Sequence, residues 1–384
     1  MSRTPLKHGI FLAPYHPVEE NPTTALQRDI EMCGYLERLG FDEIWVGEHH
    51  SSGFEMIASP ELFIAAAAQA TRRIRFGTGV ISLPYHHPLM VANRLAQLDH
   101  QTMGRVTFGF GPGQLVSDAM MIGLDPNKSR DRMAEALDAI VRLMNGEAVT
   151  MKTEWFELND ARAHLLPYSD PPKFAVASAI TPSGGRLAGQ YGMSMLCIAA
   201  SVVAGFDVLA KNWEVACQVA AENGHTMQRS ELRLVAPMHI AETSAQAREN
   251  VKFGLERWAK FYDVASNNPY VSDGRELVDV LIESKRAVIG TPEDAIAMIE
   301  RMQGQQGEFG FFLQQHVDWA DWEQTRRSHE LYARFVMPHF AKANQNRRHS
   351  FDWIVADQEA QRAKRLEAVD LAFKKHEAQQ AGKK

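Results

Sequence analysis

The stretch RIRFGTGVISLPYHHPLMVANRLAQLDHQTMGRVTFGFGPG, residues 73–113, carries the clearest fold signal in this chain. It begins with an apolar run over Ile74–Leu83 that has the length of a strand. A segment of helical period follows over Pro88–Gln101, and a second strand-length run occupies Val106–Phe110. A strand, a helix and another strand in this order predict a β–α–β unit of a parallel sheet.

The same alternation continues on both sides of this unit. Eight strand-length apolar runs alternate with longer helical segments, and eight β–α units are the number that closes a parallel barrel. The predicted fold class is therefore α/β, a (β/α)8 TIM barrel, and an open doubly wound sheet is the alternative. The expected strands are Lys7–Ala13, Glu43–Val46, Ile74–Leu83, Val106–Phe110, Phe174–Ala179, Met193–Ile198, Leu232–Ala241 and Phe309–Gln314.

Two insertions and a tail complete the expected organisation. Residues 145–172 and 263–286 lack a clear period and are predicted to be irregular. The barrel domain is expected to cover residues 1–345. Residues 346–384 are dense in Lys, Glu, Gln and Ala, which predicts a charged C-terminal helical extension outside the barrel.

Composition excludes several classes of partner. The formal net charge of -6 does not favour nucleic acid or anionic lipid. The longest apolar runs, such as Phe63–Ala68, are too short to span a membrane, and no secretion signal is visible at the N-terminus. The three cysteines have no metal-ligand spacing. These features predict a cytoplasmic protein.

The segment EIWVGEHHS places Glu48, His49 and His50 directly after the second expected strand. In a parallel barrel the chemistry lies where strands end, so one imidazole is expected to bind or protonate a reacting oxygen atom. A structural role, in which the histidines bond nearby backbone, remains open. His86 and His87 follow the third strand, and the histidines together also permit a metal-dependent hydrolase, although no metal-ligand spacing supports it.

Glycine-rich segments follow three other strands. Gly77 and Gly79 allow a flat ring to approach the main chain, or only permit a tight bend of the barrel. GFGPG at residues 109–113 poses the same question. TPSGG at residues 181–185 precedes a helix whose free N–H groups suit a phosphate, and Arg130 carries a matching charge.

Together these segments resemble the bacterial luciferase-like flavin monooxygenases, and within them the limonene monooxygenase branch. The resemblance rests on GFDEIWVGEHH, on the long run from SPELFIAAAAQ to VTFGFGPG, and on RLAGQYG, GTPEDAIAMIERM and LYARFVMPHF. It covers most of residues 7–337 in order. The resemblance implies the same (β/α)8 barrel, with reduced FMN bound at its C-terminal face.

The resemblance also implies roles for individual residues. His49 matches a position near the reactive edge of the flavin, and His50 adjoins it. A cis peptide is implied at Gly79–Val80. Where the luciferase pattern has a reactive cysteine followed by arginine, this chain has Gly111 and Pro112, which leaves one phosphate contact missing or supplied elsewhere. The residues expected to bind the cofactor are Gly79, Val80, Gly111, Arg130, Thr181, Ser183 and Gly184.

The implied activity is a two-component monooxygenation. Reduced FMN, supplied by a separate NAD(P)H-dependent reductase, would react with O2 to a C4a-peroxyflavin that oxygenates a terpene or a cyclic ketone. A homodimer is the family expectation. A deazaflavin-dependent oxidoreductase and a non-catalytic flavin-binding protein are alternatives. The apolar residues expected to line the substrate pocket are Phe11, Tyr15, Phe54, Met56 and Ile198, although aromatic residues at barrel ends also serve plain packing.

Overall fold

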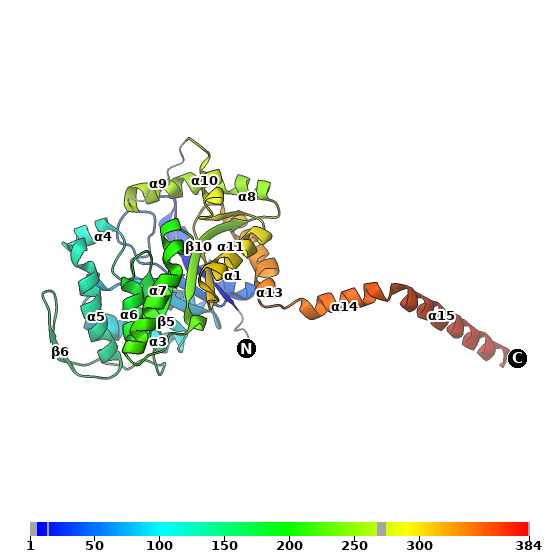
Figure 1. Ribbon diagram of the computed structural model, residues 1–384, viewed down its shortest axis with the longest axis horizontal. Coiled ribbons are helices and arrows are strands. Elements are labelled where there is room, and N and C mark those ends of the chain that lie inside the picture. The colour runs from blue at the N-terminus through cyan, green and yellow to red at the C-terminus, as the bar shows by residue number, and fades with distance from the viewer. Residues whose placement is uncertain (1–5, 14, 267–273, 383–384) are drawn as a thin grey trace. The chain divides into compact units, whose positions relative to one another are not determined.

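The structure is a computed structural model that describes residues 6–13, 15–266 and 274–382. The chain divides by its contacts into two compact units, Met1–Met337 and Pro338–Lys384. This division falls before the predicted domain boundary at residue 345. The first unit contains all the strands (Figure 1).

Eight parallel strands of the first unit close into a barrel. The neighbours run in the order β1-β2-β3-β5-β8-β9-β10-β12, and β12 pairs with β1 while β10 pairs with β9. The ring has no free edge, which confirms the predicted TIM barrel and excludes the open sheet. All eight predicted strands are present, as β1 (Lys7–Leu12), β2 (Glu43–Val46), β3 (Arg75–Thr78) with its continuation β4 (Ile81–Ser82), β5 (Val106–Gly111), β8 (Phe174–Ser178), β9 (Ser194–Cys197), β10 (Arg233–Ile240) and β12 (Phe311–His316).

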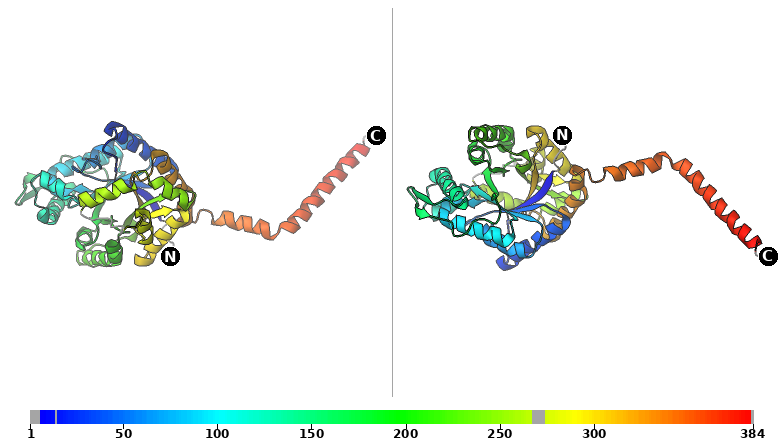
Figure 2. Two further views of the ribbon diagram at one scale, coloured as in Figure 1. Left: turned by 90° about the horizontal axis from the view of Figure 1, so that it is seen from above. Right: turned by 90° about the horizontal axis from the view of Figure 1, so that it is seen from below.

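Figure 2 shows the molecule of Figure 1 from above and from below, and helices surround the strands in both views. Several begin with proline in the first turn, where the missing N–H has no intrahelical partner to lose. The α-helices that lie within the first unit are α1 (Pro22–Leu39), α2 (Pro60–Gln69), α3 (Pro88–Thr102), α4 (Val116–Met121), α5 (Ser129–Met144), α6 (Ser183–Tyr191), α7 (Val203–Glu222), α8 (Ser244–Val251), α9 (Leu255–Ser266), α10 (Leu277–Glu283), α11 (Pro292–Gln306) and α12 (Trp322–Leu331).

The barrel interior is filled by large side chains from alternate strand positions. Trp45 is fully buried there, and Gly77 on the neighbouring strand has no side chain because the indole ring occupies that space. This close contact explains Gly77 by packing rather than by cofactor binding. Near the N-terminal ends of the strands, buried Glu43 accepts hydrogen bonds from the Trp45 indole and the Arg233 guanidinium.

The two segments predicted to be irregular contain regular structure. Residues 145–172 include an antiparallel hairpin of β6 (Val149–Lys152) and β7 (Glu157–Ala161). The second segment, in which residues 267–273 lie outside the described residues, contains α10, and β11 (Val288–Gly290) follows it beside β10. Between β10 and the second segment, the chain forms two separate helices, α8 and α9, because the helix is interrupted between Val251 and Leu255.

The second unit contains α13 (Met337–Phe340) apart from its first residue, α14 (Gln345–Ala356) and α15 (Gln358–Ala381), and none of these helices has a buried residue. Charged residues alternate along α15, as the composition predicts. Among the described helices of the whole chain, none combines the length and the apolarity needed to cross a bilayer.

Buried histidines outside the barrel interior should make the fold sensitive to acid. Burial lowers the pKa of His8 to about 3 and that of His239 to about 4, and it also lowers the pKa of His316 and His329. Below the unfolded value of about 6.5 the unfolded chain binds these protons and the folded chain does not. The free energy of unfolding is therefore expected to decrease as the pH falls below about 6.5.

We expect His8 and His239 each to reduce the free energy of unfolding by about 2 kcal/mol between pH 7 and pH 5. Urea midpoints measured at the two pH values test this expectation. His239→Gln should flatten the dependence, whereas His87→Gln, at an exposed histidine, should leave it unchanged. A urea midpoint at pH 5 that is as high as the midpoint at pH 7 would contradict the role of these side chains.

Candidate functional site

A cavity of about 730 Å³ lies at the C-terminal ends of the barrel strands. This volume is typical of pockets for cofactors and drug-sized ligands. Its wall is built by the segments that follow β1, β2, β3, β5, β8 and β9, together with α5, α6 and the end of β12. The strand ends therefore converge on one cavity, as the barrel argument predicts.

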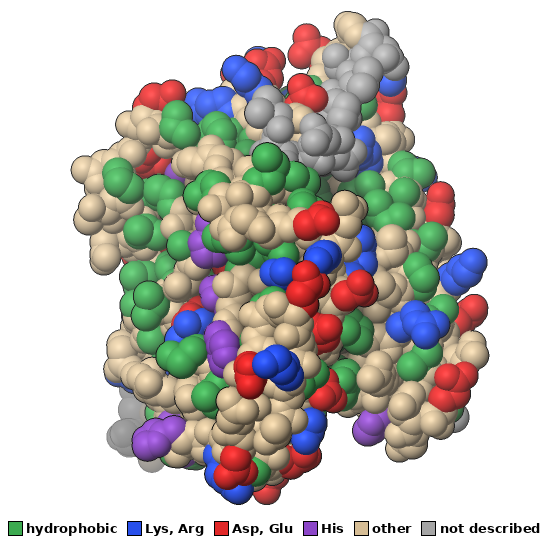
Figure 3. Space-filling view, turned by 90° about the vertical axis from the view of Figure 1, so that its left-hand side faces the viewer, with side chains coloured by type: hydrophobic (Ala, Val, Ile, Leu, Met, Phe, Trp, Pro, Cys, Tyr) green, Lys and Arg blue, Asp and Glu red, His purple; other side chains and the backbone are tan. Residues whose placement is uncertain are grey.

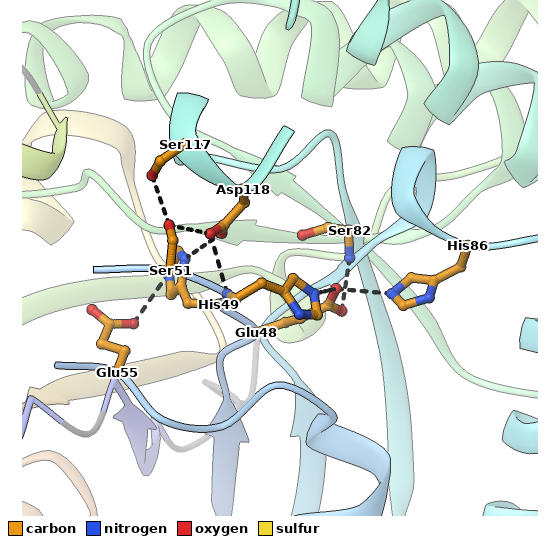
Figure 4. A network of polar contacts seen from close by, with 9 residues as sticks. Glu48, His49, Ser51, Glu55, Ser82, His86, Ser117 and Asp118 are labelled. Carbon is orange, nitrogen blue, oxygen red and sulfur yellow. Dashed lines mark hydrogen bonds and ion pairs between the residues drawn. The ribbon is translucent and has the colours of Figure 1, made fainter. Parts of the chain in front are cut away.

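His49 lies in the wall of this cavity between two carboxyl groups (Figure 4). Its Nδ1 is 3.2 Å from Asp118 Oδ2 and its Nε2 is 3.1 Å from Glu55 Oε2. Burial opposes protonation of the ring, but Glu55 and Asp118 outweigh burial and raise the pKa of His49. The imidazole is therefore held as a proton donor with both nitrogens engaged.

Glu55 and Asp118 differ in their environments. Burial raises the pKa of the Glu55 carboxyl, which also lines the cavity. Burial has the same effect on Asp118, but hydrogen bonds from His49, Ser51 and the His50 backbone N–H outweigh it and lower the pKa of Asp118. One proton can thus reside on either His49 or Glu55, at the edge of the cavity, while Asp118 stays ionised and orients the ring.

His50 is not among the residues that line the cavity, although the sequence pairs it with His49 as a second active-site imidazole. Its Nε2 donates to Glu48 Oε1 at 2.9 Å, and its ring packs edge-on against Tyr85. His86 donates to the same oxygen at 2.8 Å, while the Ser82 backbone N–H donates to the other oxygen (Figure 4). His50 does not line the cavity, so its placement favours a supporting role.

Another part of the cavity wall carries two arginines and the start of a helix, together with Asp131. Thr181, Ser183 and Gly184 lie at the start of α6, and Arg130 of α5 lines the same region. Arg186, one turn into α6, also lines the cavity. Within the described residues, neither Arg130 nor Arg186 has an ion-pair partner. Free N–H groups at a helix start and two guanidinium groups form an anion-binding end.

Glycines shape a further part of the cavity wall. Gly79 lines the cavity, and the peptide bond between Gly79 and Val80 is cis, as the resemblance implies. A Cβ atom at Gly79 would lie 2.9 Å from the Phe11 ring, so the wall has no room for a side chain there. Gly111 does not line the cavity, which corrects its expected position: its missing side chain makes room for Val80.

The predicted substrate residues separate into two groups. Phe11 and Ile198 line the cavity. Tyr15, Phe54 and Met56 do not, since Tyr15 and Phe54 stack on one another with ring centroids 4.6 Å apart and belong to a hydrophobic cluster that includes Phe261. The aromatic pair therefore packs behind the cavity.

Other wall residues were not expected from the sequence. Phe261 and Tyr262 of α9 line the cavity, and Gln315 of β12 donates to the Tyr262 hydroxyl at 3.0 Å. Glu55, Asp118 and Arg186 were also missed. Asp118 lies 69 positions after His49, so no local motif connects them, whereas Arg186 directly follows the TPSGG segment and could have been recognised as a second cation.

The face that carries α4 and α5 is rich in hydrophobic side chains (Figure 3). Residues in and next to α4 are about half exposed or more, although they are large and apolar. Such a surface is typical of an interaction site, although scattered apolar residues also occur on monomers. These residues are Val116, Met120, Met121 and Ile122.

Comparison with known proteins adds independent findings. Residues 6–308 match a family model described as luciferase-like monooxygenase. Limonene 1,2-monooxygenase of Rhodococcus erythropolis is 48% identical over 333 residues, which cover 86% of this chain and 86% of that protein. The 4-hydroxyprotoasukamycin monooxygenase of Streptomyces nodosus subsp. asukaensis is 44% identical over 365 residues, 93% of this chain and 98% of that one.

A solved structure shares the barrel. It is the oxygenating constituent of 3,6-diketocamphane monooxygenase from Pseudomonas putida, a type II Baeyer–Villiger monooxygenase in complex with FMN. The TM-score is 0.72 at 24% identity, and the match covers 87% of this chain and 98% of that one. The range matched by the family model contains every residue that lines the cavity except Gln315.

Proposed function

Because the chain belongs to the luciferase-like monooxygenase family, we propose that it uses reduced FMN and oxygen to oxygenate a small apolar substrate. The substrate class is a terpene or a cyclic ketone, in keeping with the relatives that act on limonene and on a diketocamphane. The observation that carries the proposal is one cavity that combines two arginines at a helix start, an apolar wall and an imidazole held between two carboxyl groups.

The residues of the cavity fit a flavin mononucleotide. Gly184 lets the start of α6 pack close against the Ala177 carbonyl, where a Cβ atom would collide, and this contact keeps the helix start at the cavity wall. Gly79 leaves a flat wall for a ring system, beside Phe11. In the family pattern an arginine stands at the position of Pro112. In this chain Arg186 would supply the second guanidinium instead.

Each part of the wall has its own task in this proposal. Bound reduced FMN supplies the activation of oxygen. Arg130, Arg186 and Ser183 hold the phosphate, which fixes the position of the ring. Phe11 and Ile198 exclude water from the reacting region. His49 keeps a proton at the cavity wall, with Asp118 fixing its ring and Glu55 sharing the proton.

Partners and cofactor choice follow from the same proposal. The chain shows no nicotinamide-binding fingerprint, so a separate NAD(P)H-dependent reductase would supply reduced FMN. A deazaflavin-dependent reaction is the second candidate, since an anion-binding end and an apolar wall suit that cofactor too. The homodimer and the cytoplasmic location remain predictions from the sequence.

Arg130→Ala and Arg186→Ala are each expected to weaken binding of reduced FMN by about tenfold, because a charge-assisted hydrogen bond is lost at a partly solvated site. Binding of reduced riboflavin, which lacks the phosphate, should not change. Anaerobic titrations of the full chain with both flavins measure this difference. Arg142→Ala is the matched control, since Arg142 is exposed at the other end of α5.

Equal losses for FMN and riboflavin in the two variants would show that these arginines do not recognise the phosphate. Tighter binding of a reduced deazaflavin than of reduced FMN by the unmodified chain would favour the second candidate. Oxygenated product from a terpene or a cyclic ketone, formed only when the reductase and FMN are both present, would support the proposed reaction.

A further inference from the structure

Glu48, His50 and His86 bring three metal-ligand atoms together beside the cavity. Glu48 Oε1, His50 Nε2 and His86 Nε2 all lie within 4.8 Å of one another. The carboxylate oxygen is 2.9 Å from the His50 nitrogen and 2.8 Å from the His86 nitrogen. Two imidazoles and one carboxylate form a ligand set that Zn²⁺ and other first-row transition cations bind in proteins.

We propose that Glu48, His50 and His86 form a binding site for a transition cation of the Zn²⁺ class beside the cavity. The cation would replace the two N–H···O hydrogen bonds with three ligand bonds, while each imidazole Nε2 gives up its proton to its own Nδ1 or to solvent. One or more open positions would hold water. The site is independent of the flavin, so the proposal goes beyond the proposed function.

The geometry requires only a small adjustment. Tetrahedral coordination with ligand bonds of about 2.0–2.1 Å separates the ligand atoms by about 3.3 Å, so each imidazole must retreat from Glu48 by about half an ångström. The two histidine nitrogens, which lie within 4.8 Å of one another, must adopt the same separation. The side chains of His50 and His86 are 29% and 21% exposed, which gives them room to move and gives the cation access. Glu48 is held in place by the Ser82 backbone N–H, which bonds its second oxygen.

A second group of metal-ligand atoms shows what distinguishes this site. His16, Glu20 and Asp318 also lie close together, but the two ring nitrogens of His16 bond Asp29 at 3.0 Å and Asp318 at 2.8 Å. Burial opposes protonation of His16, but the two aspartates outweigh it and raise its pKa to about 10. That imidazolium already engages both of its nitrogens with the aspartates, whereas Glu48 bonds two histidines whose side chains are partly exposed.

Occupation of the site should affect the neighbouring active-site loop. Glu48 lines the cavity and directly precedes His49 in the chain. A bound cation takes away the hydrogen bonds that Glu48 accepts from His50 and His86 and adds positive charge beside His49. Zn²⁺ is therefore expected to inhibit the enzyme reversibly, with activity restored by a chelator.

The test is a calorimetric titration of the full, flavin-free chain with ZnCl2 after treatment with a chelator. We expect one saturable site per chain, and His86→Gln should weaken it at least about tenfold. His87→Gln is the matched control, because His87 is the adjacent, exposed histidine and does not belong to the cluster. Circular dichroism of each variant checks that it has folded.

Crystals of the unmodified chain soaked in ZnCl2 provide a second measurement that needs no variant. An anomalous peak between Glu48, His50 and His86 supports the site. Absence of saturable binding by the unmodified chain, or unchanged binding by folded His86→Gln, would overturn it. A chain that binds Zn²⁺ here but binds no flavin would overturn the proposed function while leaving this site intact.

Discussion

His49→Gln should reduce formation of oxygenated product by roughly 10²-fold while FMN binding stays close to that of the unmodified chain. A positioned proton donor contributes roughly 10²–10⁴-fold to a reaction, and glutamine can donate a hydrogen bond but cannot transfer a proton. The reducing equivalents should then leave as hydrogen peroxide. The measurement is the ratio of product to oxygen consumed, with hydrogen peroxide quantified in parallel.

His50→Gln is the natural comparison for this variant. His50 is the adjacent residue, but it bonds Glu48 and does not line the cavity, so its replacement should lower the coupling ratio far less. Unchanged coupling in His49→Gln, with normal flavin binding, would contradict a role for His49 in proton delivery. Equal losses in both variants would point instead to a general disturbance of the loop after β2.

Arg233→Met is expected to lower the free energy of unfolding by about 3–5 kcal/mol, because it leaves the Glu43 carboxylate buried without its cation. Arg233 is 2% exposed and Glu43 is 1% exposed. The guanidinium donates to both oxygens of Glu43, at 2.8 Å and 3.2 Å, and lies 4.2 Å from the centre of the Phe311 ring. Urea and thermal unfolding midpoints measure the loss.

A double variant separates the charge from the packing. Arg233→Met with Glu43→Leu removes both buried charges and keeps apolar volume, so most of the stability lost in the single variant should return. If Arg233→Met lowers the free energy of unfolding by less than about 1 kcal/mol, Glu43 must find another partner or water in the barrel.

The barrel could be predicted because its strands are buried on both faces. Such strands form short, nearly continuous apolar runs, as in Phe174–Ser178, and helices of clear period separate them. The β6–β7 hairpin was missed because its sequences VTMK and ELNDA are largely polar and exposed. β11 has only three residues, too few to show a period.

The sequence could predict those site residues that directly follow a barrel strand. His49, Gly79 and Ser183 follow strands along the chain, and the closed barrel brings them to one cavity. The partners of His49 could not be found in this way, because Glu55 and Asp118 reach it through loop conformation and through α4. The packing of Tyr15 against Phe54 likewise depends on a hydrophobic cluster that forms only in the folded protein.

Anaerobic titration of the full chain with reduced FMN tests the central claim most directly, which is that the strand ends form a flavin cavity. The account predicts saturable binding of one reduced FMN per chain, in preference to reduced riboflavin. A chain that shows no saturable binding of reduced FMN, or that binds only a reduced deazaflavin, would contradict it.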